Sequence, residues 1–91
     1  MHPHQPRIDH CNRALEAVRP VIPADLYTEV HDYINRHNEW GLGIETLIDR
    51  LSELELRVTA EQFALIETAM ASMDLADSSR ITYLREHNVV A

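Results

Sequence analysis

Six histidines, one cysteine and fifteen acids are the residues of this 91-residue chain that could do chemistry. Metal ligands on one helical face stand three or four residues apart, whereas His31 and His37 are six apart and no His-Glu-x-x-His run is present. His10 directly precedes Cys11, and adjacent side chains on a helix do not face each other, so they form no nucleophile pair. Surface histidines and a buried thiol explain the pattern, and we expect no metal site.

The carboxylates and glycines do not build a catalytic site either. A glycosidase needs two carboxylates across a cleft, whereas the acids here fall on the expected solvent faces of helices. Gly41 and Gly43, the only glycines, lie inside one expected helix and form no phosphate-binding loop. The Asp77-Ser78-Ser79 run resembles the Asp-Ser-Leu of acyl carrier proteins only in its first two residues. We expect a protein that is not an enzyme and has no cofactor.

The charge balance indicates the kind of partner. Fifteen acids oppose eight bases, all of them arginine, and give a net charge of −7. Such a chain is poorly suited to nucleic acid, which is held by Lys and Arg, and well suited to a basic protein. No apolar run approaches the roughly 18 residues of a membrane helix, so no membrane contact is expected. The N-terminus has no apolar signal region and Cys11 has no partner, which favours a cytoplasmic location.

Hydrophobic periodicity predicts an all-α fold, a single compact bundle of four to five short helices. Residues 1–7 are polar and contain two prolines, so we expect a flexible tail there and one helical domain over 8–91. No segment alternates apolar and polar residues long enough to predict a strand. The expected helices cover about 8–19, 23–37, 39 or 40 to 54, 60–73 and 78–87.

Local signals set the ends of these helices. Pro20 and Pro23 end the first helix, and Thr59 with Gln62 has the spacing of a capping box. Gly41 and Gly43 are poor residues for a helix interior, so they predict a close backbone approach or an irregular first turn. Trp40 is in phase with the apolar stripe of its helix and is expected in the core.

The feature that remains is an acidic surface on the second and third helices. If these helices are antiparallel neighbours, their acids rim a shared surface near the turn at 37–45, which would suit a basic protein. A solvated helix face, or for Glu39 a helix-capping role, is the structural alternative. Tyr27 and Tyr33 are candidate anchors within the patch. The expected partner-binding residues are Glu39, Glu45, Asp49, Asp32, Glu53 and Tyr33.

Part of the sequence that forms this surface resembles a known protein family. The segment 33–51, with Glu39-Trp40-Gly41 followed by Glu45 and Leu47, resembles the signature of MafI family immunity proteins. The likeness extends over about 23–76. It departs from the family where Asn38 replaces a glycine, where Gly43 replaces an alanine, and in the last helix, where Tyr83 stands in place of the usual tryptophan.

The resemblance implies a small cytoplasmic antitoxin that protects a bacterium from a secreted polymorphic toxin in interbacterial competition. The acidic balance agrees with a basic toxin domain, and nucleases are among the candidates. The family motif assigns no interface residues. A regulatory or scaffold interaction domain is the main alternative, and a promoter-binding antitoxin and an enzyme are the others. Both a monomer and a homodimer are compatible with the pattern.

Overall fold

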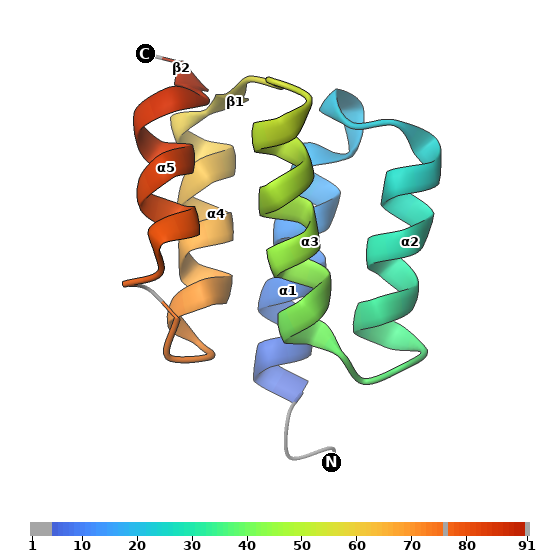
Figure 1. Ribbon diagram of the computed structural model, residues 1–91. Coiled ribbons are helices and arrows are strands. Elements are labelled where there is room, and N and C mark those ends of the chain that lie inside the picture. Colours follow the sequence, from blue (N-terminus) through green and yellow to red (C-terminus); the bar gives the residue numbers. More distant parts are fainter. Residues whose placement is uncertain (1–4, 76, 91) are drawn as a thin grey trace.

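The computed structural model describes residues 5–75 and 77–90, and in these ranges the chain is all-α with one very short sheet. Figure 1 shows the helices running alternately up and down. The fold class expected from the periodicity is confirmed. The elements are α1 (Gln5–Val18), a 3-10 turn η1 (Arg19–Val21), α2 (Ala24–Asn35), α3 (Trp40–Glu53), β1 (Val58–Thr59), α4 (Ala60–Ala71), α5 (Ser79–His87) and β2 (Val89–Val90).

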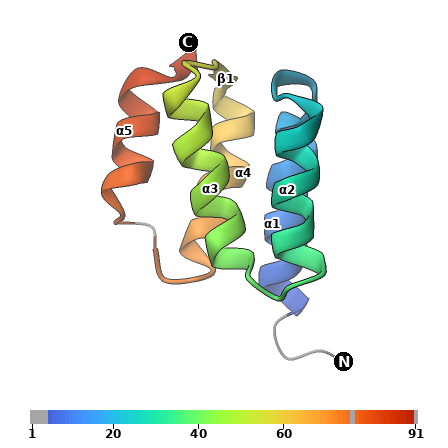
Figure 2. The same ribbon diagram turned by 45° about the vertical axis from the view of Figure 1, so that its right-hand side comes forward.

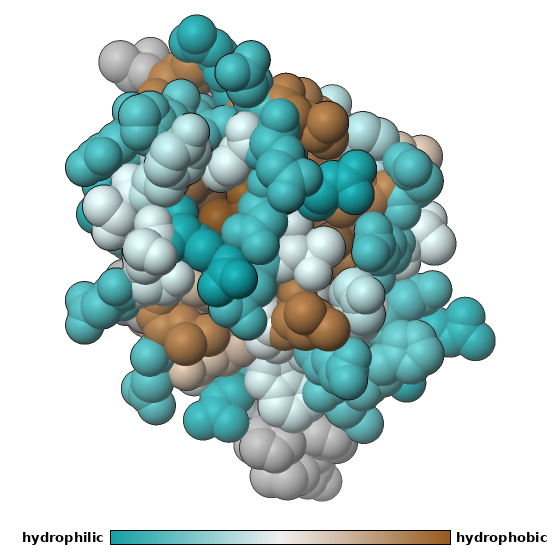
Figure 3. Space-filling model, viewed as in Figure 1, coloured by the Kyte–Doolittle hydropathy of each residue, from teal (hydrophilic) through white to brown (hydrophobic). Residues whose placement is uncertain are grey.

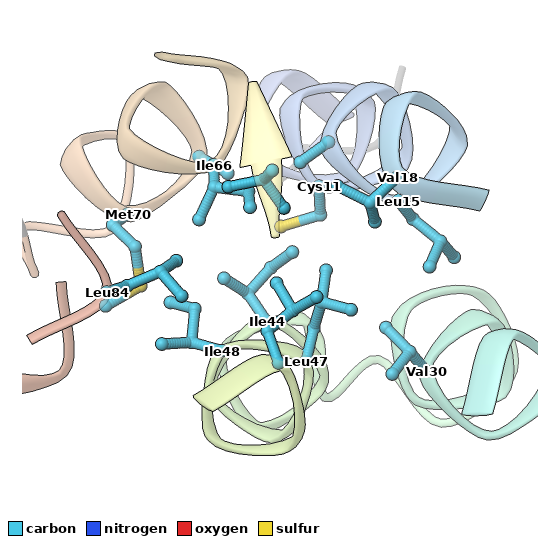
Figure 4. Close-up of a cluster of buried hydrophobic side chains, with 14 of the residues drawn as sticks. Cys11, Leu15, Val18, Val30, Ile44, Leu47, Ile48, Ile66, Met70 and Leu84 are labelled. Atoms are coloured by element: carbon cyan, nitrogen blue, oxygen red, sulfur yellow. The ribbon is translucent and has the colours of Figure 1, made fainter. Parts of the chain in front are cut away.

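The helices form two layers. Helices α5, α3 and α2 lie side by side in one layer, with α3 in the middle, and α4 and α1 form the other (Figures 1, 2 and 4). Helices α2 and α3 are consecutive in the chain and antiparallel. Helix α3 also contacts α5, although α4 lies between them in the sequence. Both flanks of α3 are therefore covered by other helices, and its outward side is not.

The core lies between the two layers. Figure 4 shows side chains from all five helices meeting there, among them Cys11, Ile44, Ile66 and Leu84. Fully burying one such aliphatic side chain stabilises the fold by about 1.5–3 kcal/mol. Trp40 packs against this core but is only partly buried, so the expectation that it lies inside holds only in part.

The first helix begins earlier than expected. The tail predicted over 1–7 is wrong for residues 5–7, which belong to α1, and residues 1–4 lie outside the described part of the chain. Pro6 is tolerated because the first turn of a helix has amide groups without helical acceptors. The Arg7 guanidinium also donates to the Ser72 carbonyl at 3.0 Å, which ties this turn to the end of α4. The end of α1 at Val18, just before Pro20, agrees with the proline signal.

The expected capping box is present, and a second cap starts α5. Thr59 and Gln62 form a reciprocal capping box, with the Gln62 amide donating to Thr59 Oγ1 at 3.1 Å and the Thr59 amide donating to Gln62 Oε1 at 2.7 Å. Ser78 accepts a hydrogen bond from the Arg80 amide and caps α5.

Gly43 marks the close approach that its position predicts. A Cβ atom there would stand 3.1 Å from Ile34 Cγ1, 3.1 Å from Tyr33 Cβ and 3.4 Å from the Val30 carbonyl oxygen. Helices α2 and α3 can lie this close because the side chain is missing. Gly41 has no such constraint, since its added Cβ would meet only Met73 Sδ at 3.8 Å.

The end of α3 is held in a left-handed turn at Glu55, whose φ is 55°. The Leu56 amide donates to the Leu51 carbonyl and the Glu55 amide to the Ser52 carbonyl, which is the Schellman arrangement that normally has glycine at this position.

We expect Glu55→Gly to raise the free energy of unfolding by about 0.5–1 kcal/mol, because the left-handed cost of about 1–2 kcal/mol is removed and only partly offset by chain entropy. Glu55→Ala keeps the strained backbone and loses the same charge, so it should not stabilise the fold. Urea unfolding of the two variants checks this, and equal effects would show that the charge is responsible.

The last described residues close the fold. Val58 pairs with Val89, and Thr59 with Val90, in a parallel two-stranded sheet, so the expectation of no strand is wrong at these four residues. Two-residue strands are too short to show an alternating pattern in the sequence. Beside them Asn88, which is 4% exposed, donates from Nδ2 to the Leu51 carbonyl at 3.0 Å and the Leu56 carbonyl at 2.8 Å. The Asn88 carbonyl accepts from the Val58 amide at 2.9 Å.

Candidate protein-binding face

Two of the predicted site residues are held by an arginine from another helix. Arg80, in the first turn of α5, donates from Nη1 to Glu45 Oε2 at 2.8 Å and from Nε to Asp49 Oδ1 at 2.9 Å. All three side chains are partly exposed, so each ion pair contributes at most about 1 kcal/mol to stability. The consequence is mainly geometric, because one guanidinium fixes two carboxylates one helical turn apart.

The expected shared rim of α2 and α3 is therefore wrong for Glu45 and Asp49. Two residues turn a helix by about 200°, so Glu45 points away from the flank where Gly43 touches α2. Glu45 and Asp49 lie on the flank of α3 that meets α5. Periodicity identifies the inward side of α3, but it does not say which helix covers which flank.

The other predicted site residues are spread over the molecule. Asp32 and Tyr33 are partly buried on α2, and the Tyr33 ring meets the His37 ring edge-on at 6.5 Å. Glu39 is exposed at the N-cap of α3, and its side chain makes no capping hydrogen bond. Glu53 is exposed and lies 3.9 Å from the Arg50 guanidinium. Tyr27, the other candidate anchor, is partly buried with the Arg19 guanidinium 4.3 Å from its ring centre.

A shallow groove lies between α3 and α5, beside Asp49 and Glu53. It consists of two adjoining hollows that share Ser52 and Tyr83. The Tyr83 side chain is 50% exposed, and its ring lies 4.1 Å from the ring centre of His87. The lining residues of the two hollows are Asp49, Ser52, Glu53, Glu55, Arg57, Ser79, Arg80, Tyr83, His87 and Asn88.

Three residues on the α3–α5 side of the molecule were not among the predicted site residues. Leu42 and Tyr83 are exposed, and Arg80 connects the two helices. Leu42 lies outside the apolar stripe of α3 and is 47% exposed. Arg80 lies 31 and 35 residues from its carboxylate partners, so no local spacing connects them. Figure 3 views this side of the molecule and shows a mostly hydrophilic surface interrupted by separate hydrophobic patches.

The groups considered for metal or nucleophilic chemistry do not come together in the described part of the chain. Within residues 5–75 and 77–90, no three His, Cys, Asp or Glu side chains are placed to hold a metal ion. Cys11 is fully buried, and its thiol faces the Trp40 carbonyl oxygen at 4.0 Å. Burial raises the pKa of the Cys11 thiol from 9.0 to about 12.

This shift predicts a loss of stability in alkali. The unfolded thiol ionises above about pH 9 while the folded thiol keeps its proton up to about pH 12, so stability falls as pH rises through this window. Through Cys11 alone, raising the pH from 8 to 10 should lower the free energy of unfolding by about 1–1.5 kcal/mol. Urea unfolding at both pH values checks this against Cys11→Ala, whose loss should be smaller by that amount. Equal losses in the two proteins would show that the thiol titrates normally.

None of the described helices combines the length and hydropathy needed to cross a membrane.

Comparisons with protein-family models, curated proteins and solved structures gave no match to this chain. The resemblance to MafI proteins therefore stays a prediction from the sequence, made on the segment 33–51 and its extension over about 23–76.

Proposed function

We propose that this chain is a non-enzymatic immunity protein that binds a basic bacterial toxin domain and covers its active site or substrate groove. The supporting observation is the placement of the family-like segment. Its Glu39-Trp40-Gly41 run opens α3, the middle helix of the three-helix layer, and no element of the described residues covers the outward side of this helix. The segment that resembles an immunity signature thus presents an uncovered, acid-bearing surface.

The charge supports a basic partner. The chain carries −7, and Glu39 and Glu53 are exposed near the two ends of α3. Electrostatic attraction of this kind accelerates association more than it strengthens the final complex. A toxin that handles a phosphate-rich substrate would have the basic groove that such a surface fits.

Capture and rescue test the proposal. The tagged protein is used to isolate its partner from the native lysate, and the partner is identified by mass spectrometry. We expect one stoichiometric protein that is toxic when expressed alone and harmless when this chain is co-expressed. Self-association alone, or a partner without toxicity, would contradict the immunity function and favour a scaffold or regulatory domain.

Reversing two acids on α3 should slow association with that partner. We expect the double variant Glu39→Arg and Glu53→Arg to lower the association rate constant about tenfold at low salt, within the range of electrostatic steering. Surface plasmon resonance measures the rate. These acids are preferable to Glu45 and Asp49, whose reversal would also disrupt the contact with Arg80.

Glu16→Arg with Glu61→Arg is the matched control, because it changes the net charge equally in the layer of α1 and α4. Glu16 has a weak pair with Arg19 at 3.5 Å, as Glu53 has with Arg50, and Glu61 lies in a first helical turn. Equal slowing by both double variants would mean that net charge, and not the α3 surface, attracts the partner.

A further inference from the structure

One side of α3 carries a continuous stripe of residues that are exposed or partly exposed. Leu42, Glu45, Asp49 and Ser52 recur at i, i+3, i+7 and i+10, the spacing of one helical face. At 1.5 Å per residue the stripe is about 15 Å long. Its lower end is the 47% exposed Leu42, and its middle is the pair of carboxylates held by Arg80.

Helix α5 extends this stripe sideways. Arg80 lies beside Glu45 and Asp49, and Tyr83 follows one turn later beside Ser52. Tyr83 keeps half of its surface in solvent, although its ring has a neighbour in His87. The face therefore has an apolar group at each end and a fixed ionic group between them.

We propose that this face docks a basic protein surface, with Leu42 and Tyr83 as its two apolar anchors and Arg80 as a positioning residue. Half-exposed Leu42 and Tyr83 can bury further area against a partner, and the polar groups around them form the rim that excludes water. Arg80 occupies only one oxygen of each carboxylate, which leaves Glu45 Oε1 and Asp49 Oδ2 as acceptors for arginine or lysine of the partner. This assignment rests on the proposed function and names the surface that performs it.

Arg80 contributes by limiting motion. A free glutamate or aspartate must lose side-chain freedom when it binds, whereas these two are already held at 2.8 and 2.9 Å. A protein surface of positive charge fits this face, because Glu39 and Glu53 near the two ends of α3 attract basic groups and the half-exposed anchors Leu42 and Tyr83 can bury apolar area against it.

Anchor variants test the proposal with the partner isolated by capture, used as its purified domain. We expect Leu42→Ser and Tyr83→Ser each to weaken affinity about tenfold or more. Leu65→Ser is the control, since Leu65 is a 37% exposed leucine on α4 in the other layer. Loss of rescue by the anchor variants, with unchanged melting temperature, supports the assignment. Full binding by both anchor variants overturns it and leaves the immunity function standing.

The role of Arg80 needs a readout beyond loss of binding. Arg80→Gln should raise the dissociation rate about three- to tenfold. Arg80→Lys keeps the charge but cannot bind both carboxylates at once, so its dissociation rate should lie between those of Arg80→Gln and the original protein. An unchanged dissociation rate in Arg80→Gln overturns the positioning role.

A probe that does not depend on capture makes the surface testable by itself. A short synthetic amphipathic peptide with arginine and leucine on one face is titrated into the full chain, and amide shifts are followed by NMR. We expect the shifts to concentrate at 42–53 and 79–84 and to shrink in Leu42→Ser. Shifts spread evenly over α1 and α4 would overturn the docking face, whereas shifts on the expected face without any captured toxin would contradict only the immunity function.

Discussion

Asn88→Ala is expected to lower the free energy of unfolding by about 2–3 kcal/mol, because it removes two hydrogen bonds of a buried side chain and leaves the partly buried Leu56 carbonyl without its donor. Asn88 donates to two carbonyl groups, those of Leu51 and Leu56. The Leu51 carbonyl keeps a second donor in the Leu56 amide, whereas the Leu56 carbonyl loses the one donor that the described residues give it. For a chain of this size the loss corresponds to a fall in melting temperature of roughly 10–20 °C.

A second asparagine provides the control. Asn35 Nδ2 also donates two hydrogen bonds, to Asn12 Oδ1 and the His31 carbonyl, but it is exposed. Water can replace these bonds, so Asn35→Ala should cost about 0.5–1 kcal/mol. Circular dichroism with urea unfolding compares the two variants. Equal losses would contradict the view that the burial of Asn88 makes its hydrogen bonds important.

Gly43→Leu is expected to lower the free energy of unfolding by about 3 kcal/mol or more, since even its Cβ would stand 3.1 Å from two atoms of α2. The remaining side-chain atoms must force α2 and α3 apart, which also loosens contacts of Val30 and Ile34 in the core. Denaturant unfolding measures the loss.

Gly41→Leu makes the control as close as the chain allows. It introduces the same side chain two residues earlier in the same helix, where Met73 Sδ at 3.8 Å is an ordinary contact. Its better helix propensity, about 1 kcal/mol, should leave stability equal or higher. If Gly43→Leu and Gly41→Leu have the same free energy of unfolding, α2 and α3 are not held at the distance that Gly43 permits.

Much of the fold could be predicted because local rules determine it. The apolar stripe of α3, the prolines after α1 and the Thr59–Gln62 capping box each depend on residues within one or two helical turns. The start of α1 was misplaced because a proline in the first turn is compatible with both a tail and a helix.

The candidate face could be predicted only in part. The sequence identifies Glu45 and Asp49 as acids on the outer side of a helix. Their partner Arg80 lies on α5, which is separated from α3 in the sequence by α4. Which helix covers which flank of α3 depends on packing across the whole molecule, and no spacing in the sequence encodes it. Leu42 was missed because it is the exposed exception to an otherwise regular pattern.

The pairing of β2 with β1, directly before α4, also affects the order in which the protein can fold during translation. Pairing of Val58 with Val89 cannot occur until the ribosome has added both α4 and α5, and the Leu56 carbonyl has no donor from Asn88 until that residue is made. Helices α1 to α3 can pack earlier, since their contacts are close in the chain. Closure of the sheet therefore has to wait until residues 88–90 have been made, and a chain stopped before Asn88 would lack the sheet and the Asn88 hydrogen bonds while α5 keeps its contacts with α3.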